Sequence, residues 1–201
     1  MKKRLHHNGQ YICDYESTGD DLKDLAAVNA IMAARGLDFK PTPEQAIFRQ
    51  ALSFANISAD IFQKYLLITP PDGSGMAPFV VNAVFGIELY LKTLALQHGK
   101  KLRGHEIVQL FRKLPSGAKA EIERQLKTLS GTSQWASGVK SIADLQTVLA
   151  ELDTAFTDWR YLHENTRSKP LKITFQPTIF LAEILHAACA ANHVPEGSGK
   201  V

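Results

Sequence analysis

The sequence predicts an all-α protein, an antiparallel bundle of about six or seven helices. Residues 79–96 are apolar at nearly every helical position, which predicts a central helix that other elements cover on most sides. Other segments repeat apolar residues with the 3.6-residue period of an amphipathic helix, and segments rich in proline and glycine, such as 69–75, separate them. We expect any strand to be a short piece.

The composition is that of an ordinary globular protein. Of 201 residues, 45% are hydrophobic and 21% are charged, enough for one substantial core. We expect an N-terminal arm and first helix over 1–42, a helical bundle over 43–194 and a disordered tail over 195–201. The formal charge of +3 permits an acidic partner such as RNA but does not require one.

The cysteines and histidines predict no metal and no cofactor. Cys13 and Cys189 are far apart, so they suggest neither a disulfide framework nor a zinc site. The scattered histidines lack metal-ligand spacing, and the sequence contains no Walker loop, dinucleotide fingerprint or nucleophile elbow.

We expect a cytoplasmic protein that does not cross a membrane. The basic start at 1–4 is followed by polar residues at 6–10, where a signal peptide would need an apolar run. The apolar segment 79–96 carries polar and charged residues that are costly in a bilayer: Asn82, Glu88 and Lys92.

The first part of the chain is expected to hold two helices. Residues 1–19 are polar and without a sustained period, so they predict a loose arm with a short strand at 11–13. An apolar stripe of helical spacing between Asp20 and Gly36 predicts the first helix. Pro43 then opens a second helix, expected over 44–67.

After the loop at 69–75 comes the central helix, which Gly99 is expected to end. A basic turn and a short helix follow it. Ser116 is expected to cap a helix over 117–129, and Ser141 with Asp144 resembles a capping box that opens a helix over 142–165. Pro177 opens the last helix.

Three short strings resemble the core of the HEPN superfamily (higher eukaryotes and prokaryotes nucleotide-binding). They are Gly86-Ile87-Glu88-Leu89-Tyr90-Leu91-Lys92, Gly104-His105-Glu106-Ile107 and Leu110-Phe111. The resemblance runs from about residue 51 to residue 191 and implies a small antiparallel helical bundle. The first fifty residues lie outside it.

Reactive side chains cluster at 158–167. If the helix continues that far, Arg160, His163, Glu164 and Arg167 share one face. Histidine can move protons and arginine can hold a phosphate, a set that suits metal-independent RNA cleavage. The alternative is a polar helix edge on which Glu164 pairs with the two arginines.

The resemblance implies, for RNA-cleaving members, an arginine followed by four to six residues and then a histidine, paired across a dimer. Here only two residues separate Arg160 from His163. Arg160-Tyr161 with Glu164 instead resembles a variant motif of members without catalysis. We therefore expect binding without turnover, and a homodimer formed through the helix that carries Arg160.

Glu88 and the basic turn complete the candidate site. A carboxylate on an apolar helix needs a partner, and either Lys92 one turn later or Arg160 across the bundle could supply it. Cations crowd the following turn, where they either face a phosphate or offset the helix dipole. These residues are Lys100, Lys101 and Arg103, beside His105.

Three functions stay open at the level of the sequence. The first is a HEPN-like module that binds RNA, a nucleotide or a protein partner, in a toxin-antitoxin or defence system, without catalysis. The second is an active ribonuclease that uses Arg160 and His163. The third is a structural dimerisation module that has no ligand.

Overall fold

The computed structural model describes residues 1–7, 10–37, 41–136, 138–160 and 172–193, with Thr157 and Arg160 described in their backbone alone. The chain divides into two compact units, the first including Met1–Pro41 and the second spanning Thr42–Val194. Each unit is described by itself below.

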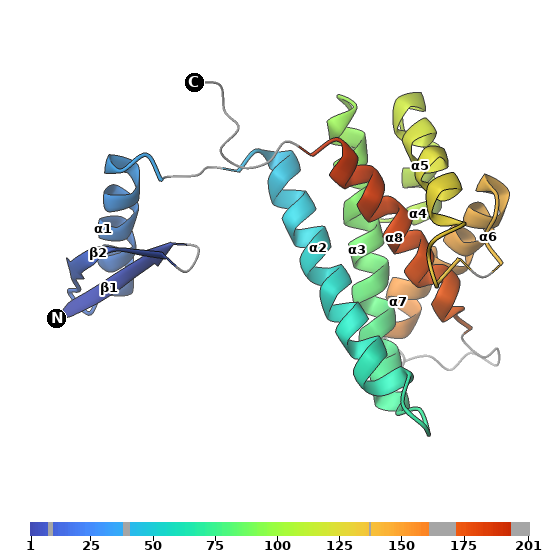
Figure 1. Ribbon diagram of the computed structural model, residues 1–201, viewed down its shortest axis with the longest axis horizontal. Coiled ribbons are helices and arrows are strands. Elements are labelled where there is room, and N and C mark those ends of the chain that lie inside the picture. The colour runs from blue at the N-terminus through green and yellow to red at the C-terminus, as the bar shows by residue number, and fades with distance from the viewer. Residues whose placement is uncertain (8–9, 38–40, 137, 161–171, 194–201) are drawn as a thin grey trace. The chain divides into compact units, whose positions relative to one another are not determined.

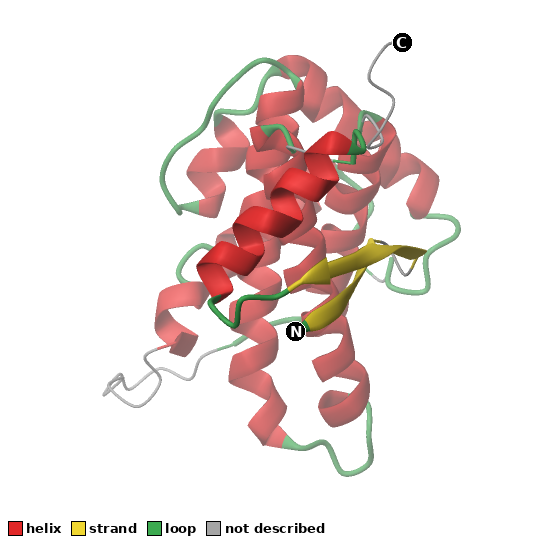
Figure 2. Cartoon of the chain, turned by 90° about the vertical axis from the view of Figure 1, so that its left-hand side faces the viewer, coloured by secondary structure: helices red, strands yellow, loops and turns green. Residues whose placement is uncertain are grey.

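The first unit is a β-hairpin with one helix. Strand β1 (Lys2–His7) pairs antiparallel with β2 (Gln10–Glu16), and α1 (Asp21–Ala34) lies beside them (Figure 2). The hairpin corrects two expectations, the strictly all-α fold and the loose N-terminal arm. Half-buried and exposed residues alternate along β1, as expected for a strand. Lysine, arginine and histidine fill most of its positions, so the sequence does not show the alternation of apolar and polar residues that would have predicted the strand.

A polar cluster joins α1 to the hairpin. Asp24 is buried, and its carboxylate accepts hydrogen bonds from the Ser17 hydroxyl, from the Thr18 N–H at 2.7 Å and from Lys3 Nζ at 3.2 Å. Asp20 caps the helix by accepting from the backbone of its first turn. The expected helix after Asp20 is confirmed.

The second unit is a helical bundle. Its seven described α-helices agree with the expected number; they are α2 (Pro43–Ile61), α3 (Met76–Gln97), α4 (Ile107–Arg112), α5 (Ser116–Leu129), α6 (Ile142–Leu152), α7 (Ala155–Arg160) and α8 (Phe175–Ala191). A π-helical turn η1 (Phe62–Leu66) extends α2, and a 3-10 turn η2 (Gly73–Gly75) precedes α3. Figure 1 shows α3 running beside α2 and α8.

Helix α3 is the central helix that the sequence predicts. Most of its residues are buried, among them Phe79, Ile87, Leu91 and Leu94 at 0% exposure. Gly86 allows a close approach to α2, since a β-carbon there would lie 3.4 Å from the backbone nitrogen of Ala55.

By length and composition, the stretch Gly73–Gln97 is the one helical segment of the described residues that could span a membrane. Of an 18-residue apolar window within this stretch, 72% is buried inside the bundle, which is also what the core helix of a folded domain shows.

The expected helix over 142–165 is two helices in the structure. The capping box of Ser141 and Asp144 opens α6 as predicted, but α6 ends at Leu152 and α7 begins at Ala155. At the break, the Asp153 carboxylate accepts a hydrogen bond from the Val108 N–H at 2.9 Å, in the first turn of α4. The apolar stripe continues across the break because Leu152, Ala155 and Trp159 are all buried in the same core.

Candidate functional site

The candidate site is built around Glu88, a carboxylate on the buried central helix. Its side chain is only 5% exposed, and Oε1 lies 2.6 Å from Lys92 Nζ and 3.0 Å from His105 Nδ1. Of the two partners that the sequence left open for Glu88, Lys92 is in contact with it. Both side chains are largely buried, so the pair lies inside the bundle surface rather than on an exposed helix edge. The two partners meet the requirement that a buried charge be paired.

His105 lies in the segment between α3 and α4. Its side chain is 80% exposed although its Nδ1 contacts the buried Glu88. The other ring nitrogen, Nε2, is therefore on the side available to a ligand. Gly104, with φ of +97°, provides the left-handed backbone that turns the chain before His105. The carboxylate holds the imidazole in one place, as a second partner does for many functional histidines.

The basic turn follows the end of α3. Gly99 (φ +74°) ends the helix as predicted, and Lys100, Lys101 and Arg103 are exposed beyond it. Lys100 donates from Nζ to the Lys113 carbonyl at 2.7 Å, at the end of α4. The structure shows no side-chain partner for Lys101 or Arg103 among the described residues, so these two cations can meet an anion.

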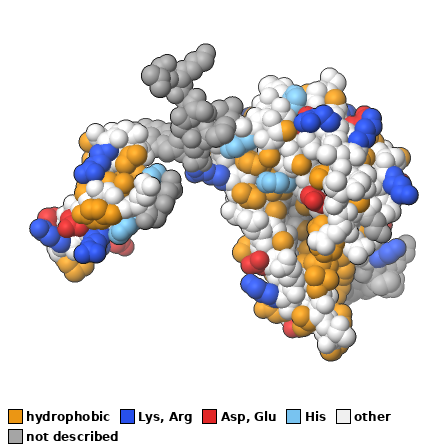
Figure 3. Space-filling view, in the orientation of Figure 1, with side chains coloured by type: hydrophobic (Ala, Val, Ile, Leu, Met, Phe, Trp, Pro, Cys, Tyr) orange, Lys and Arg blue, Asp and Glu red, His pale blue; other side chains and the backbone are white. Residues whose placement is uncertain are grey.

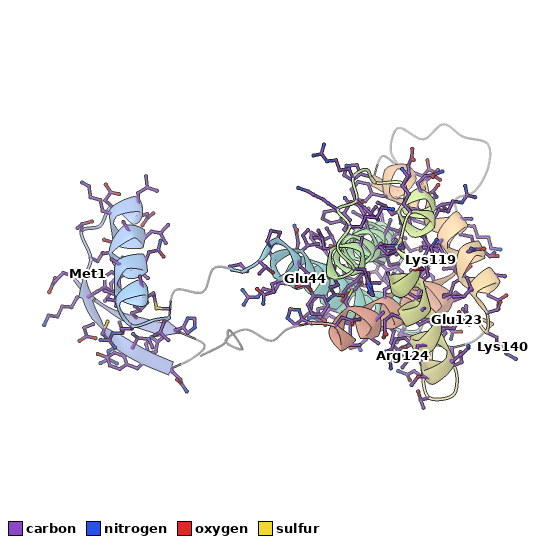
Figure 4. All side chains as sticks on the ribbon, turned by 90° about the horizontal axis from the view of Figure 1, so that it is seen from above. Met1, Glu44, Lys119, Glu123, Arg124 and Lys140 are labelled. Carbon is purple, nitrogen blue, oxygen red and sulfur yellow. The ribbon has the colours of Figure 1, made fainter. Side chains whose placement is uncertain are left out.

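A second pair of cations lies near this turn, and the sequence reasoning did not select it. Lys119 on α5 donates from Nζ to the Arg112 carbonyl at 2.8 Å, so Lys100 and Lys119 both reach the last residues of α4. A hollow of about 400 Å³ is lined by Arg112, Ser116, Lys119 and Glu123, among others. Figure 4 marks Lys119 and Glu123 on α5. Arg112 and Lys113 stand just before Pro115 in the sequence. Grouping these two cations with those of the basic turn would have selected them as candidate residues.

The predicted site residues on the late helix have no described side chains. Arg160 is the last residue of α7, and Tyr161, His163, Glu164 and Arg167 lie outside the described residues. Helix α7 does pack against α3, where the rings of Phe85 and Phe156 lie with centroids 6.0 Å apart. The pairing of Glu88 with Arg160 therefore stays a prediction.

A separate groove runs between α2 and α8, with α3 as its floor. It has a volume of about 320 Å³, and hydrophobic side chains gather on the face between these helices (Figure 3). His186 Nδ1 lies 3.2 Å from the Tyr90 hydroxyl, and Glu183 accepts from the Ser133 hydroxyl at 2.5 Å. Burial lowers the pKa of His186, so this groove offers a neutral imidazole and a single carboxylate.

Within the described part of the chain, no three His, Cys, Asp or Glu side chains come together as metal ligands. No family model matches the chain, and no curated protein or solved structure matches it either.

Proposed function

We propose that this chain is a HEPN-like helical module that binds RNA or a nucleotide through its phosphates, without cleaving it. The observation that carries the proposal is the contact of buried Glu88 with exposed His105, in the same short segment as exposed Lys101 and Arg103. A hydrogen-bonding ring held by a carboxylate, with two cations close by in the chain that have no side-chain partner among the described residues, is a suitable surface for a phosphate.

Other cations could extend this surface along a nucleic acid. Lys100 and Lys119 both bind carbonyls at the end of α4, which keeps Arg112 and Lys113 in the same region. Neutralising several phosphates makes binding strongly dependent on salt, because bound cations release counterions from the nucleic acid. Capping of the α4 carbonyls explains Lys100 and Lys119 without a ligand, so the test rests on Lys101 and Arg103.

Fluorescence anisotropy with a fluorescein-labelled single-stranded RNA tests this proposal. We expect the Lys101→Ala/Arg103→Ala variant to bind more weakly and to flatten the dependence of log K on log salt by about 0.7 for each lost phosphate contact. A matched control removes two exposed cations elsewhere, as Lys64→Ala/Lys140→Ala. Equal losses in both variants would indicate nonspecific attraction, and absence of binding by the wild type would refute the proposal.

The role of His105 is tested separately in the same assay. His105→Ala removes the ring but leaves Lys101, Arg103 and the Glu88–Lys92 pair in place, so we expect weaker RNA binding without loss of the helical signal in the far ultraviolet. Since the side chain is 80% exposed, its removal opens no cavity in the core. Unchanged affinity would assign His105 to anchoring the loop alone.

A second candidate function, metal-independent RNA cleavage, is favoured by the same contact. A carboxylate that orients an imidazole with its second nitrogen exposed is an arrangement used for proton transfer. The sequence offers Arg160 and His163 as a further pair. Incubating RNA with the protein and EDTA, beside His105→Ala and Arg160→Ala/His163→Ala variants, separates the two functions. The binding proposal expects no fragments from any of them.

A further inference from the structure

Small side chains create the groove between α2 and α8. The residues that line it on each of these helices repeat at spacings of three, four and seven, so each set forms one helical face. They are Leu52, Ala55, Asn56 and Ala59 on α2, and Ile179, Ala182, Glu183 and His186 on α8. With Ala83 on α3, alanines from three helices surround a space of about 320 Å³ that larger side chains would fill.

One carboxylate lies among these mostly apolar walls. Glu183 is half-buried, and its Oε2 accepts a hydrogen bond from the Ser133 hydroxyl. Its other oxygen, Oε1, has no partner among the described residues. The described residues that line the groove include no lysine and no arginine. The groove therefore has a negative charge that nothing in its own lining compensates.

The imidazole one turn later on α8 is held in place and is uncharged. His186 Nδ1 contacts the Tyr90 hydroxyl, and the ring stacks on Phe48 with centroids 5.8 Å apart. Burial lowers the pKa of His186, although Glu183 acts in the opposite direction. The ring thus adds no positive charge that would neutralise the carboxylate.

We propose that the α2–α8 groove binds a small organic amine. The cationic nitrogen pairs with Glu183, and an apolar body of about one aromatic ring with a short chain fills the space between the alanines, beside Trp135. The volume is at the lower end of the range of about 300–1,000 Å³ for small-molecule sites, which suits a ligand of this size. This inference goes beyond the phosphate-binding surface, which is basic and takes an anion, and does not depend on it.

The charge of the groove favours an amine over other small ligands. A purely apolar ligand would exclude water from Glu183 Oε1 without replacing its hydrogen bonds, and an anion would be repelled. An ammonium group supplies both donors and the opposite charge, and the pair is stronger where water is partly excluded. The chain as a whole has a formal charge of +3, so nonspecific attraction would favour an anion instead.

An NMR titration with two compounds of the same body, phenylpropylamine and phenylpropionate, tests the proposal. The readout is the indole N–H signal of Trp135, which lines the groove, and Trp159, which is not among the lining residues, is the control in the same spectrum. We expect the amine to bind about tenfold more tightly than the acid. An amine that binds no more tightly than the acid, or that shifts both tryptophan signals equally, would overturn the proposal.

Glu183→Gln separates ligand binding from a purely structural role. The amide keeps an acceptor for the Ser133 hydroxyl, which itself accepts from the Trp135 N–H at 3.1 Å, but the negative charge is lost. We expect the preference for the amine to fall to about twofold or less. The matched control Glu123→Gln, on α5 and outside the groove, should keep the preference. A preference that survives Glu183→Gln would assign the carboxylate to anchoring Ser133 alone and overturn the proposal.

Filling the groove tests where the ligand lies. Ala182→Leu places a larger side chain in the space, so we expect the amine to bind about tenfold more weakly. Ala190→Leu makes the same change at an exposed position of the same helix and should leave the affinity unchanged. Circular dichroism checks that both variants keep their helices. Equal affinities of the two variants would place the ligand outside the groove and overturn the proposal.

Discussion

Lys92 and Lys64 each follow an acidic residue by four positions on a helix, but the two pairs differ in burial. Lys92 is 17% exposed and its partner Glu88 is 5% exposed, whereas Lys64 and Asp60 are both more than half exposed. Lys92→Met removes a partner of a buried carboxylate, and we expect it to lower the free energy of unfolding by about 3 kcal/mol.

The matched substitution Lys64→Met should change the free energy of unfolding by less than about 0.5 kcal/mol, because exposed pairs at this spacing are weak. Urea unfolding followed by tryptophan fluorescence measures both values. If both variants lost a similarly small free energy of unfolding, His105 alone would be a sufficient partner for the buried Glu88 carboxylate.

Asp24 makes the N-terminal unit sensitive to acid. Hydrogen bonds from Ser17 and Thr18, with Lys3 beside it, hold the pKa of the Asp24 carboxyl well below its usual value of 3.8. A lowered pKa stabilises the fold fully above the usual value, and this stabilisation is lost as the pH falls toward the folded pKa. We therefore expect amide NMR signals of α1 to weaken below about pH 4.

Asp24→Asn is the control for this acid transition. The amide cannot titrate, so the variant should have a less stable α1 at neutral pH and should lack the change on acidification. Signals of α1 that persist unchanged in the wild type down to about pH 2 would contradict the assignment to Asp24.

At the scale of elements, Asp153 links two helices that are distant in the sequence. Its carboxylate accepts the Val108 N–H, one of the amides in the first turn of α4 that have no partner within their own helix. We expect Asp153→Ala to lower the free energy of unfolding by about 1 kcal/mol, the usual cost of a lost helix cap.

Asp153→Asn keeps an acceptor oxygen at the same place, so its loss should be smaller. Thermal unfolding by circular dichroism compares the two variants. If the asparagine variant loses as much as the alanine variant, charge rather than the hydrogen bond is responsible.

The helices themselves were largely predictable because their signals are local. The capping box of Ser141 and Asp144 and the proline at the start of α2 mark helix ends in the sequence, and both mark them in the structure. The break between α6 and α7 was not predictable, because Asp153 bonds to a residue 45 positions away and the apolar stripe passes through the break unchanged. The hairpin escaped prediction for a related reason, since the half-buried positions of β1 include a lysine and a histidine rather than apolar residues alone.

The contacts of the candidate site also differ in whether the sequence could predict them. The pair of Glu88 and Lys92 follows from helical spacing and was one of the two alternatives that the sequence offered. The contact of His105 with Glu88 depends on the path of the chain after Gly104, which spacing does not give. Arg112 and Lys119 come together only because α4 and α5 meet at a tight turn.

At the scale of the whole molecule, one contiguous hydrophobic core runs through the helices of the second unit, from Phe48 on α2 to Cys189 on α8. Trp159 belongs to this core, and Trp135 packs against it. Trp159 is 7% exposed, and Trp135 packs edge-to-face on Phe62 with ring centroids 5.6 Å apart. Tryptophan fluorescence therefore reports on the bundle at two well-separated points of its sequence.

A contiguous core predicts that the bundle unfolds in a single cooperative transition. Leu94→Ala on α3 and Leu181→Ala on α8 each truncate a side chain with 0% exposure, and each should cost about 2–5 kcal/mol because a cavity remains. Leu52→Ala, in the α2–α8 groove with 36% exposure, is the matched control and should cost less than about 1 kcal/mol. Each core variant should shift the urea midpoints of Trp135 and Trp159 equally, as measured in single-tryptophan forms. A shift confined to one tryptophan would show that the bundle consists of two separately folding parts.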